Sequence, residues 1–276
     1  MPASVLNGGV APLGYVLAVP PRIKHNQLVI VVHGVSSQPA TVIREFAPVG
    51  REYGFVTLAP DFSGMSFRGY QRLSSSAGAG GAALALERLA AQVSARLGLD
   101  PMRFDLAGFS GGAQFAHRFA MTRPGLVRRL VVAAAGWFSE CDSSLAFPQG
   151  MGGMADDELL RQFLAIPIRI AVGTEDNSRG SNLRKESQLD ARQGSNRLER
   201  AEFWHSHLIQ RARELGIASD NRLVLLPGTG HQFRQAVENG NLDRMVANFL
   251  CGDGSLEQSN GLLSLDQTAP PSALVK

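Results

Sequence analysis

Short apolar runs alternate with amphipathic segments along most of this chain. The apolar runs predict β-strands, and the segments between them carry apolar residues at the spacing of an amphipathic helix. Several runs contain Val, Ile and Leu at successive positions, as expected for strands that are buried on both faces. The alternation therefore predicts an α/β fold, in which a mostly parallel central sheet has helices on both faces.

The same pattern predicts where the elements begin and end. Strands are expected at residues 15–19, 28–32, 55–59, 103–107, 130–135, 168–172 and 222–226. Helices are expected at residues 40–53, 82–97, 111–123, 156–163, 195–215 and 232–249. The last helix is expected to be interrupted at residues 239–241, where the sequence is Asn-Gly-Asn. We expect residues 1–251 to form one domain with a short cap insertion within residues 137–165, and residues 252–276 to form a disordered or loosely packed tail.

Composition and charge exclude several classes of protein. The 276 residues are 44% hydrophobic, which is enough to bury the core of one large domain. No apolar run approaches the roughly 18 residues that a membrane span needs, so no span is expected. The formal net charge of +3 is too small to indicate a nucleic-acid partner. We expect a small-molecule or oligomeric substrate as the partner, and a homodimer is left open.

The two cysteines bear on the expected compartment. Cys141 and Cys251 lie far apart and show neither disulfide-framework nor metal-ligand spacing. A cytoplasmic location is therefore the default expectation. A periplasmic or secreted location is the alternative if a signal peptide has been removed.

A serine lies on a sharp turn between a predicted strand and a predicted helix. The sequence Gly108-Phe109-Ser110-Gly111-Gly112 follows the strand at residues 103–107, and apolar residues at helical spacing follow it. Glycines on both sides of Ser110 allow a close approach of strand and helix, and such a turn projects the hydroxyl out of the sheet. The pattern predicts a nucleophile elbow with Ser110 as the nucleophile.

A second loop follows the strand at residues 28–32, with the sequence His33-Gly34-Val35. Acyl transfer needs two backbone N–H groups directed at the oxyanion of the tetrahedral intermediate. In an elbow enzyme one N–H belongs to the residue after the nucleophile, here Gly111, and the other to this loop. Val35 is our candidate for the second donor, with Gly34 and Ser36 as alternatives, and His33 is expected to brace the loop.

An acid and a base follow two later strands. Gly173-Thr174-Glu175-Asp176 comes directly after the strand at residues 168–172, and we assign the acid to Asp176, with Glu175 in reserve. His231 lies on a glycine-containing loop after the last strand, and its near-neutral pKa suits proton transfer in both half-reactions. The pair His205 and His207 faces different sides of one predicted helix, so no metal site is expected.

The order Ser110, Asp176, His231, with each residue at the carboxyl end of a predicted strand, resembles the α/β-hydrolase superfamily of serine hydrolases. The Gly-Phe-Ser-Gly-Gly elbow is more narrowly similar to that of bacterial esterases of the polyhydroxyalkanoate depolymerase and feruloyl-esterase types. Those enzymes often have a Ser-Ala-Gly-Gly elbow, where this chain has Ser110-Gly111-Gly112. The resemblance implies an α/β-hydrolase fold, a triad mechanism and no cofactor.

Specificity is expected to come from loops at the carboxyl ends of the strands. We expect the cap to be mobile and to present an apolar face, with these candidate substrate-binding residues: Ser36, Met65, Phe67, Trp137, Phe138 and Phe147. Tyr70, Leu145, Met151 and Met154 are further candidates for the two walls. Residues 177–215 carry more Arg and Lys than Asp and Glu, a pattern of either a solvated helix face or an anion-attracting rim. Three arginines of this region are candidates for binding a carboxylated or polyanionic substrate: Arg179, Arg184 and Arg192.

We therefore expect a carboxylesterase-like serine hydrolase that forms an acyl-enzyme. A hydrolase of amides, polyanions or polyester oligomers with the same triad is one alternative. A non-catalytic binding protein with an α/β-hydrolase-like fold is another, although such a protein would not need Ser110, Asp176 and His231 together.

Overall fold

A computed structural model describes residues 12–73, 79–153, 157–252 and 263–264 of the chain. These residues form an eight-stranded sheet with the order β1-β3-β2-β4-β5-β6-β7-β8. The six strands from β3 to β7 in that order are parallel, while the edge strands β1 and β8 are antiparallel to their neighbours. The strands are β1 (Gly14–Ala18), β2 (Val29–Val32), β3 (Thr57–Asp61), β4 (Phe104–Phe109), β5 (Val127–Ala133), β6 (Ile168–Gly173), β7 (Asn221–Leu226) and β8 (Leu263–Ser264).

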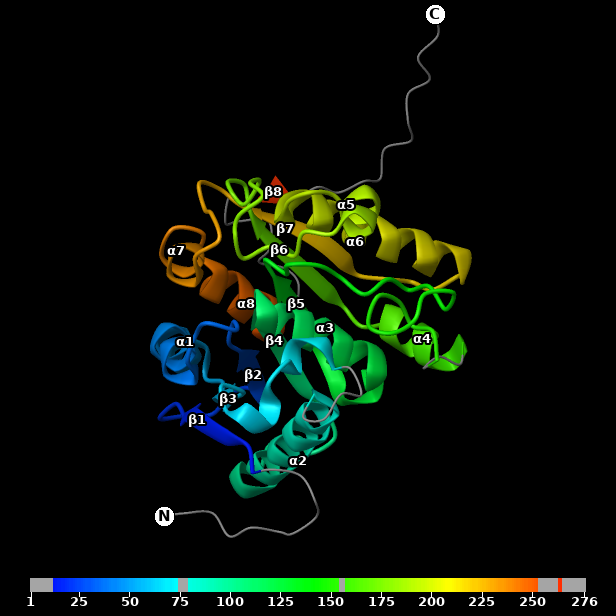
Figure 1. Cartoon of the computed structure of the whole chain (residues 1–276). Helices are drawn as coiled ribbons and strands as arrows, with labels where there is room; N and C mark the ends of the chain where they lie inside the picture. Colours follow the sequence, from blue (N-terminus) through cyan, green and yellow to red (C-terminus); the bar gives the residue numbers. More distant parts are fainter. Residues whose placement is uncertain (1–11, 74–78, 154–156, 253–262, 265–276) are drawn as a thin grey trace, which may run out of the picture.

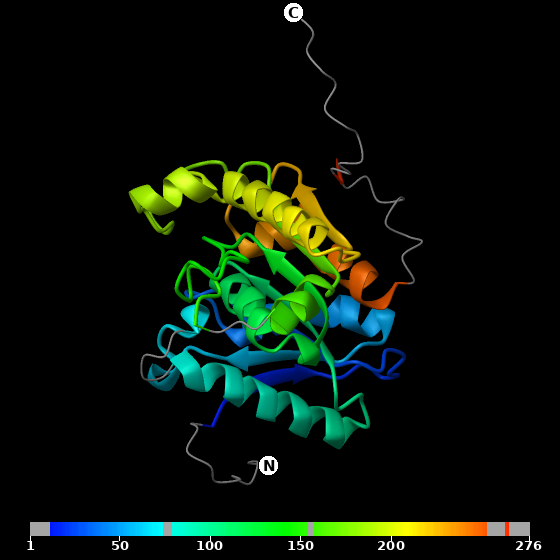
Figure 2. The ribbon, with the colours of Figure 1, turned by 90° about the vertical axis from the view of Figure 1, so that its right-hand side faces the viewer.

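Helices cover both faces of the sheet (Figures 1 and 2). One face packs against α1 (Pro39–Tyr53), α7 (Phe233–Glu238) and α8 (Leu242–Cys251). The other packs against α2 (Ala79–Leu97), α3 (Gly111–Thr122), α4 (Asp157–Leu164) and α6 (Arg197–Glu214). The remaining helical segments are α5 (Ser187–Gln193) and the short 3₁₀ turns η1 (Met65–Phe67), η2 (Tyr70–Arg72) and η3 (Pro124–Leu126).

Alternating residues of the central strands supply the two cores. In β4, Leu106 belongs to the core under α2, α3 and α6, whereas Ala107 belongs to the core under α1 and α8. In β5, Val132 and Val131 divide in the same way. All four side chains are almost completely buried, because each strand residue meets a helix on whichever face it projects from. The predicted α/β fold with helices on both faces is therefore confirmed.

The predicted elements match the observed ones closely. Every predicted strand is present, and the helix predicted at residues 232–249 is interrupted as expected, between Glu238 and Leu242. Apart from the short 3₁₀ turns, two described elements were not predicted. Helix α5 lies within a polar stretch, and Leu263–Ser264 of the predicted tail pairs with β7 as the edge strand β8. The rest of that tail from residue 253 lies outside the described residues.

Several apolar side chains of the segment predicted to be a mobile cap pack into the core. Phe138, Cys141 and Met151 are at most 1% exposed and belong to the core that includes α3 and α6. The Phe138 ring stacks on Trp204 at a centroid distance of 4.6 Å. Space is available for these side chains beside the sheet, and burying them there removes apolar surface from water. Met154 lies outside the described residues.

Candidate active site

Ser110 lies at the junction between β4 and α3 in a strained conformation. Its φ and ψ angles are 55° and −114°, which a non-glycine residue adopts only where the surrounding structure enforces them. The flanking glycines explain how the turn closes. A Cβ on Gly108 would lie 2.3 Å from the carbonyl oxygen of Gly112, and a Cβ on Gly112 would lie 2.1 Å from that of Val32. The chain therefore forms the sharp strand-to-helix turn expected of a nucleophile elbow.

The structure brings together the three residues predicted to form a triad. Ser110 Oγ lies 3.0 Å from Nε2 of His231, and Nδ1 of His231 lies 2.9 Å from Oδ2 of Asp176. Asp176 follows β6 and His231 follows β7, so neighbouring parallel strands deliver both residues to the same edge of the sheet. The imidazole also stacks on Phe109, with ring centroids 5.4 Å apart. This chain of contacts orients one imidazole between a hydroxyl and a carboxylate.

The second oxygen of the Asp176 carboxylate pairs with an arginine. Arg197 Nη1 lies 3.2 Å from Oδ1 of Asp176, and both side chains are nearly inaccessible to solvent. A buried carboxylate needs such a partner, and here the pair leaves Oδ2 directed at His231. Asn196 caps α6 by accepting a hydrogen bond from the Glu199 N–H, which fixes the turn that carries Arg197. The reserve candidate Glu175 is exposed to solvent.

Two backbone N–H groups lie together beside Ser110. A Cβ built on Gly111 would lie 3.2 Å from the backbone nitrogen of Val35, so the two predicted oxyanion donors are neighbours. Gly111 is the first residue of α3, whose N–H has no acceptor within the helix. Val35 is 62% exposed, and its loop forms one side of the cavity described below. The two residues predicted to bind an oxyanion are therefore adjacent, as that prediction requires.

His33 fixes the orientation of this loop. Its Nδ1 donates to the carbonyl oxygen of Gly34 at 2.7 Å, and its Nε2 accepts a hydrogen bond from the Phe62 N–H. The Gly34 carbonyl also accepts from the N–H of Ser37. Because a trans peptide unit directs its C=O and N–H in opposite directions, these bonds turn the N–H of Val35 away from the His33 ring. Tyr70 donates to the carbonyl oxygen of His33 and is buried rather than lining the cavity.

Three histidines that accept backbone hydrogen bonds predict how stability depends on pH. Nε2 of His33, His117 and His207 each accepts a backbone N–H, and burial lowers the pKa of all three. In the unfolded chain these groups titrate near pH 6.5, so below that pH the unfolded state binds more protons than the folded one. These histidines should therefore make their full contribution to the free energy of unfolding above about pH 6.5. The free energy of unfolding should decrease as the pH falls below that value. Thermal melting at pH 7.5 and 5.5 tests this, and a melting temperature that rises toward pH 5.5 would contradict it.

A cavity of about 840 Å³ opens over Ser110 and His231. Of the six predicted substrate-binding residues, Ser36 and Trp137 line it. The lining also includes polar residues that the sequence analysis missed: Ser37, Gln71, Arg72, Gln114, Gln149, Ser181, Asn182 and Arg197. Gln114 was recognisable, because it lies one helical turn after Ser110 on the same face of α3.

Four predicted substrate-binding residues do not line the cavity. Met65 is 80% exposed on η1, outside the cavity lining. Phe67 and Phe138 are buried in the core, and Phe147 packs against the same core. These aromatic side chains therefore bury their surface against other apolar groups beside the sheet.

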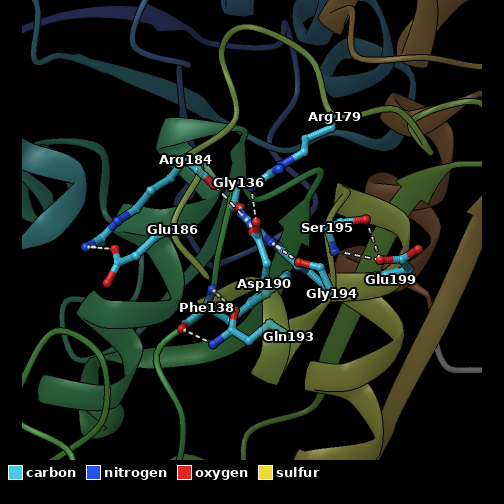
Figure 3. A network of polar contacts seen from close by, with 11 residues as sticks. Gly136, Phe138, Arg179, Arg184, Glu186, Asp190, Gln193, Gly194, Ser195 and Glu199 are labelled. Carbon is cyan, nitrogen blue, oxygen red and sulfur yellow. Dashed lines mark hydrogen bonds and ion pairs between the residues drawn. The ribbon is translucent and has the colours of Figure 1, made fainter. Parts of the chain in front are cut away.

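Only Arg184 of the three predicted arginines lines the main cavity. Arg179 pairs with Asp190, and Arg192 pairs with Glu140 at 2.6 Å. The wall that carries Arg184 belongs to a polar network around the buried Arg200, and Figure 3 shows the partners Gly136, Arg184, Asp190 and Gly194. Arg200 donates to the backbone carbonyls of Gly136, Arg184 and Gly194 and pairs with Asp190. Two separate segments of the cavity wall are thereby joined.

Comparison with protein families identifies the chain. The family model described as Esterase PHB depolymerase matches residues 13–161, more than half of the sequence. The chain belongs to this family. It is a hydrolase of the esterase and depolymerase kind, and the predicted resemblance to depolymerase-type bacterial esterases is confirmed. The match includes the Val35 loop and the Ser110 elbow, while Asp176 and His231 lie beyond it. No curated protein matches the sequence.

Solved structures confirm the α/β-hydrolase fold. Poly(aspartic acid) hydrolase-1 from Sphingomonas sp. KT-1 superimposes with a TM-score of 0.77 at 23% identity, covering 90% of this chain and 97% of the other. LpqC, a poly(3-hydroxybutyrate) depolymerase from Bordetella parapertussis, gives a TM-score of 0.72 at 24% identity, with coverage of 85% and 82%. Esterase PE8 gives 0.55 at 20% identity, with coverage of 87% and 98%. In the described ranges no helix has the length and apolar composition for a bilayer crossing.

Proposed function

We propose that the chain is a serine hydrolase that cleaves carboxylic esters through an acyl-enzyme on Ser110. The observation that supports this most strongly is the chain of contacts from Ser110 Oγ through His231 to the buried Asp176. It is supported further by the strained conformation of Ser110, which a protein without elbow chemistry would have no reason to maintain.

In the proposed first half-reaction, Ser110 Oγ attacks the carbonyl carbon of the ester while His231 Nε2 accepts the hydroxyl proton. The carbonyl oxygen becomes an oxyanion that accepts hydrogen bonds from the N–H groups of Val35 and Gly111. Asp176 holds the imidazole in the tautomer with the proton on Nδ1 and stabilises the imidazolium that forms. The intermediate then collapses, and His231 donates its proton to the departing alcohol.

The second half-reaction repeats these roles with water. His231 accepts a proton from a water molecule, which attacks the acyl carbon of the ester on Ser110. Collapse of the second tetrahedral intermediate releases the carboxylic acid, and Ser110 Oγ recovers its proton from His231. The chemistry needs no cofactor, and the partner that we propose is a small or oligomeric ester.

The proposed oxyanion donor Val35 can be tested by removing its N–H. Val35 is the second residue of a turn closed by the Ser37 N–H and the Gly34 carbonyl, a position that favours proline. Val35→Pro should therefore keep the loop while it lowers kcat on the order of 100-fold, as expected for loss of one oxyanion donor. Val35→Ala retains the N–H and is the matched control. Equal kcat values for the two variants would exclude Val35 as a donor.

Polyester oligomers and polyanionic amides are the alternative substrates that the structural neighbours suggest, through the depolymerase and the poly(aspartic acid) hydrolase. A cavity of about 840 Å³ is large enough for a short oligomer. Arginines in its lining favour a substrate that carries negative charge.

The proposed function is tested with four substrates: short-chain and long-chain p-nitrophenyl esters, a hydroxybutyrate oligomer and an anionic polyamide. We expect hydrolysis of at least one ester by the wild type and a rate at background for Ser110→Ala. Cleavage of the polyamide alone would replace the esterase assignment with an amidase of the same mechanism. Equal ester hydrolysis by the wild type and Ser110→Ala would reject the assignment of Ser110 as the nucleophile.

A further inference from the structure

Two arginines add positive charge to the cavity lining besides Arg197, which pairs with Asp176. Arg72, at the end of η2, and Arg184, between β6 and α5, both line the cavity. None of the described lining residues is Asp or Glu. A concave site with cations and no anions attracts negatively charged ligands.

Trp137 lies between this wall and a third arginine. The guanidinium carbon of Arg184 lies 4.7 Å from the centroid of the Trp137 ring, and that of Arg118 lies 3.9 Å from it. Both cations are thus within cation–π distance of one indole. The two guanidinium groups are close enough for their like charges to repel each other.

Arg118 is a buried cation without a carboxylate partner among the described residues. Its side chain is 0% exposed. Its Nε donates to Ser139 Oγ at 2.9 Å, and its Nη1 donates to the carbonyl oxygens of Gln71 and Gln114. No described group accepts from Nη2. Burial lowers the pKa of Arg118 most, and the positive charges of the neighbouring Arg184 and Arg72 lower it further. An uncompensated buried charge is costly, so an anion in the adjacent cavity would stabilise it.

The arginines that face the cavity are available to a ligand. Arg72 is exposed, and its side chain has no hydrogen-bond or ion-pair partner in the described part of the chain. Arg184 pairs with Glu186, but both side chains are more than a third exposed. An exposed ion pair of this kind contributes little to stability, so a ligand carboxylate can replace Glu186.

The position of this wall relative to Ser110 is set by α3. Ser110, Gln114 and Arg118 follow one another at intervals of four residues, so they lie along one face of the helix. From the first residue of α3 to Arg118 the helix rises by about 10 Å. Arg200 donates to the backbone carbonyls of Gly136 and Arg184, so it joins the two segments that carry Trp137 and Arg184.

We propose that Arg72 and Arg184, backed by Trp137 and Arg118, form a carboxylate subsite of the cavity. The substrate would then be an ester that carries a free carboxylate, placed on this wall while the ester carbonyl lies at Ser110. The inference rests on the proposed function, because it assigns a substrate class to the same site. The carboxylate can belong to the acyl part or to the alcohol part of the ester.

Two matched series of substrates distinguish these sources. The first contains p-nitrophenyl monoesters of dicarboxylic acids of increasing length, each compared with its methyl-blocked diester. The second contains hydroxybutyrate oligomers with a free or a methyl-blocked terminal carboxylate. In one of the series, wild-type kcat/KM should be about 10- to 100-fold higher for the free carboxylate, as expected for charge-assisted hydrogen bonds to arginine.

Substitutions of arginine test the residues themselves. Arg72→Gln and Arg184→Gln should each lower the ratio of kcat/KM between free and blocked substrate by about 10-fold. Arg68→Gln removes the same charge four residues before Arg72, where Arg68 is exposed and lies outside the cavity lining, so it should leave the ratio unchanged. A ratio near one for the wild type in both series, or a ratio that falls equally in all three variants, would overturn the proposal.

A binding measurement separates failure of the subsite from failure of the proposed function. The chain contains two tryptophans, and Trp204→Phe leaves Trp137 as the reporter. In a Ser110→Ala, Trp204→Phe background, a monoester with a free carboxylate should change the fluorescence of Trp137 at concentrations at least about 10-fold lower than its blocked analogue. This readout needs no turnover.

The two failures have different signatures. If the wild type hydrolyses esters in a way that depends on Ser110 but shows no preference for a carboxylate, the subsite alone is rejected. If the carboxylate binds but the wild type hydrolyses no ester, the subsite is supported and the esterase function is rejected.

Discussion

Ser110→Ala and His231→Ala are each expected to lower kcat for an ester substrate on the order of 10⁶-fold, and the double variant is expected to be no slower than either. The two side chains act as one unit, because the serine hydroxyl is a weak nucleophile unless an imidazole accepts its proton. The 3.0 Å contact between Ser110 Oγ and His231 Nε2 is the structural basis of this expectation. Steady-state kinetics with a p-nitrophenyl ester measures all three variants.

Thermal melting of the same variants is the control for folding. Ser110 and His231 are both only partly buried, so neither replacement should remove more than a small part of the stability. If the effects of the two single substitutions multiplied in the double variant, Ser110 and His231 would act independently and the proposed triad would be wrong.

Asp176→Asn has the second largest expected effect, a decrease of kcat on the order of 10⁴-fold. An asparagine amide at this position can donate a hydrogen bond to Nδ1 of His231, which favours the tautomer with its proton on Nε2. That tautomer cannot accept the proton of Ser110. Substrate binding should change much less, because Asp176 is 3% exposed and does not line the cavity.

Glu175→Gln is the matched control for this prediction. It removes the neighbouring carboxylate, which is exposed, and it should leave kcat within a few-fold of the wild type. A larger decrease in Glu175→Gln than in Asp176→Asn would transfer the role of the acid to Glu175, the other carboxylate after β6.

The sequence predicted the elements that depend on local pattern. Strands β2, β4 and β6 are buried on both faces, so their apolar runs were recognisable without knowledge of their neighbours. The positions of Asp176 and His231 followed from the same argument, because parallel strands deliver the residues after them to one edge of the sheet.

Contacts between distant segments could not be predicted in this way. Arg197 reaches Asp176 from the beginning of α6, and Arg118 reaches Trp137 from the second turn of α3. No periodicity shows that a particular arginine is buried. The aromatic residues between β5 and β6 misled the prediction for the opposite reason, since an apolar loop residue such as Phe138 fits either a cap or the core.

The central claim, that Ser110 is a nucleophile activated by His231, is tested most directly by labelling with a fluorophosphonate probe and mapping the adduct by mass spectrometry. The account predicts one adduct on Ser110 in the wild type, strongly slowed labelling in His231→Ala, and no adduct in Ser110→Ala. Equal labelling of the wild type and Ser110→Ala, or labelling of neither, would contradict it.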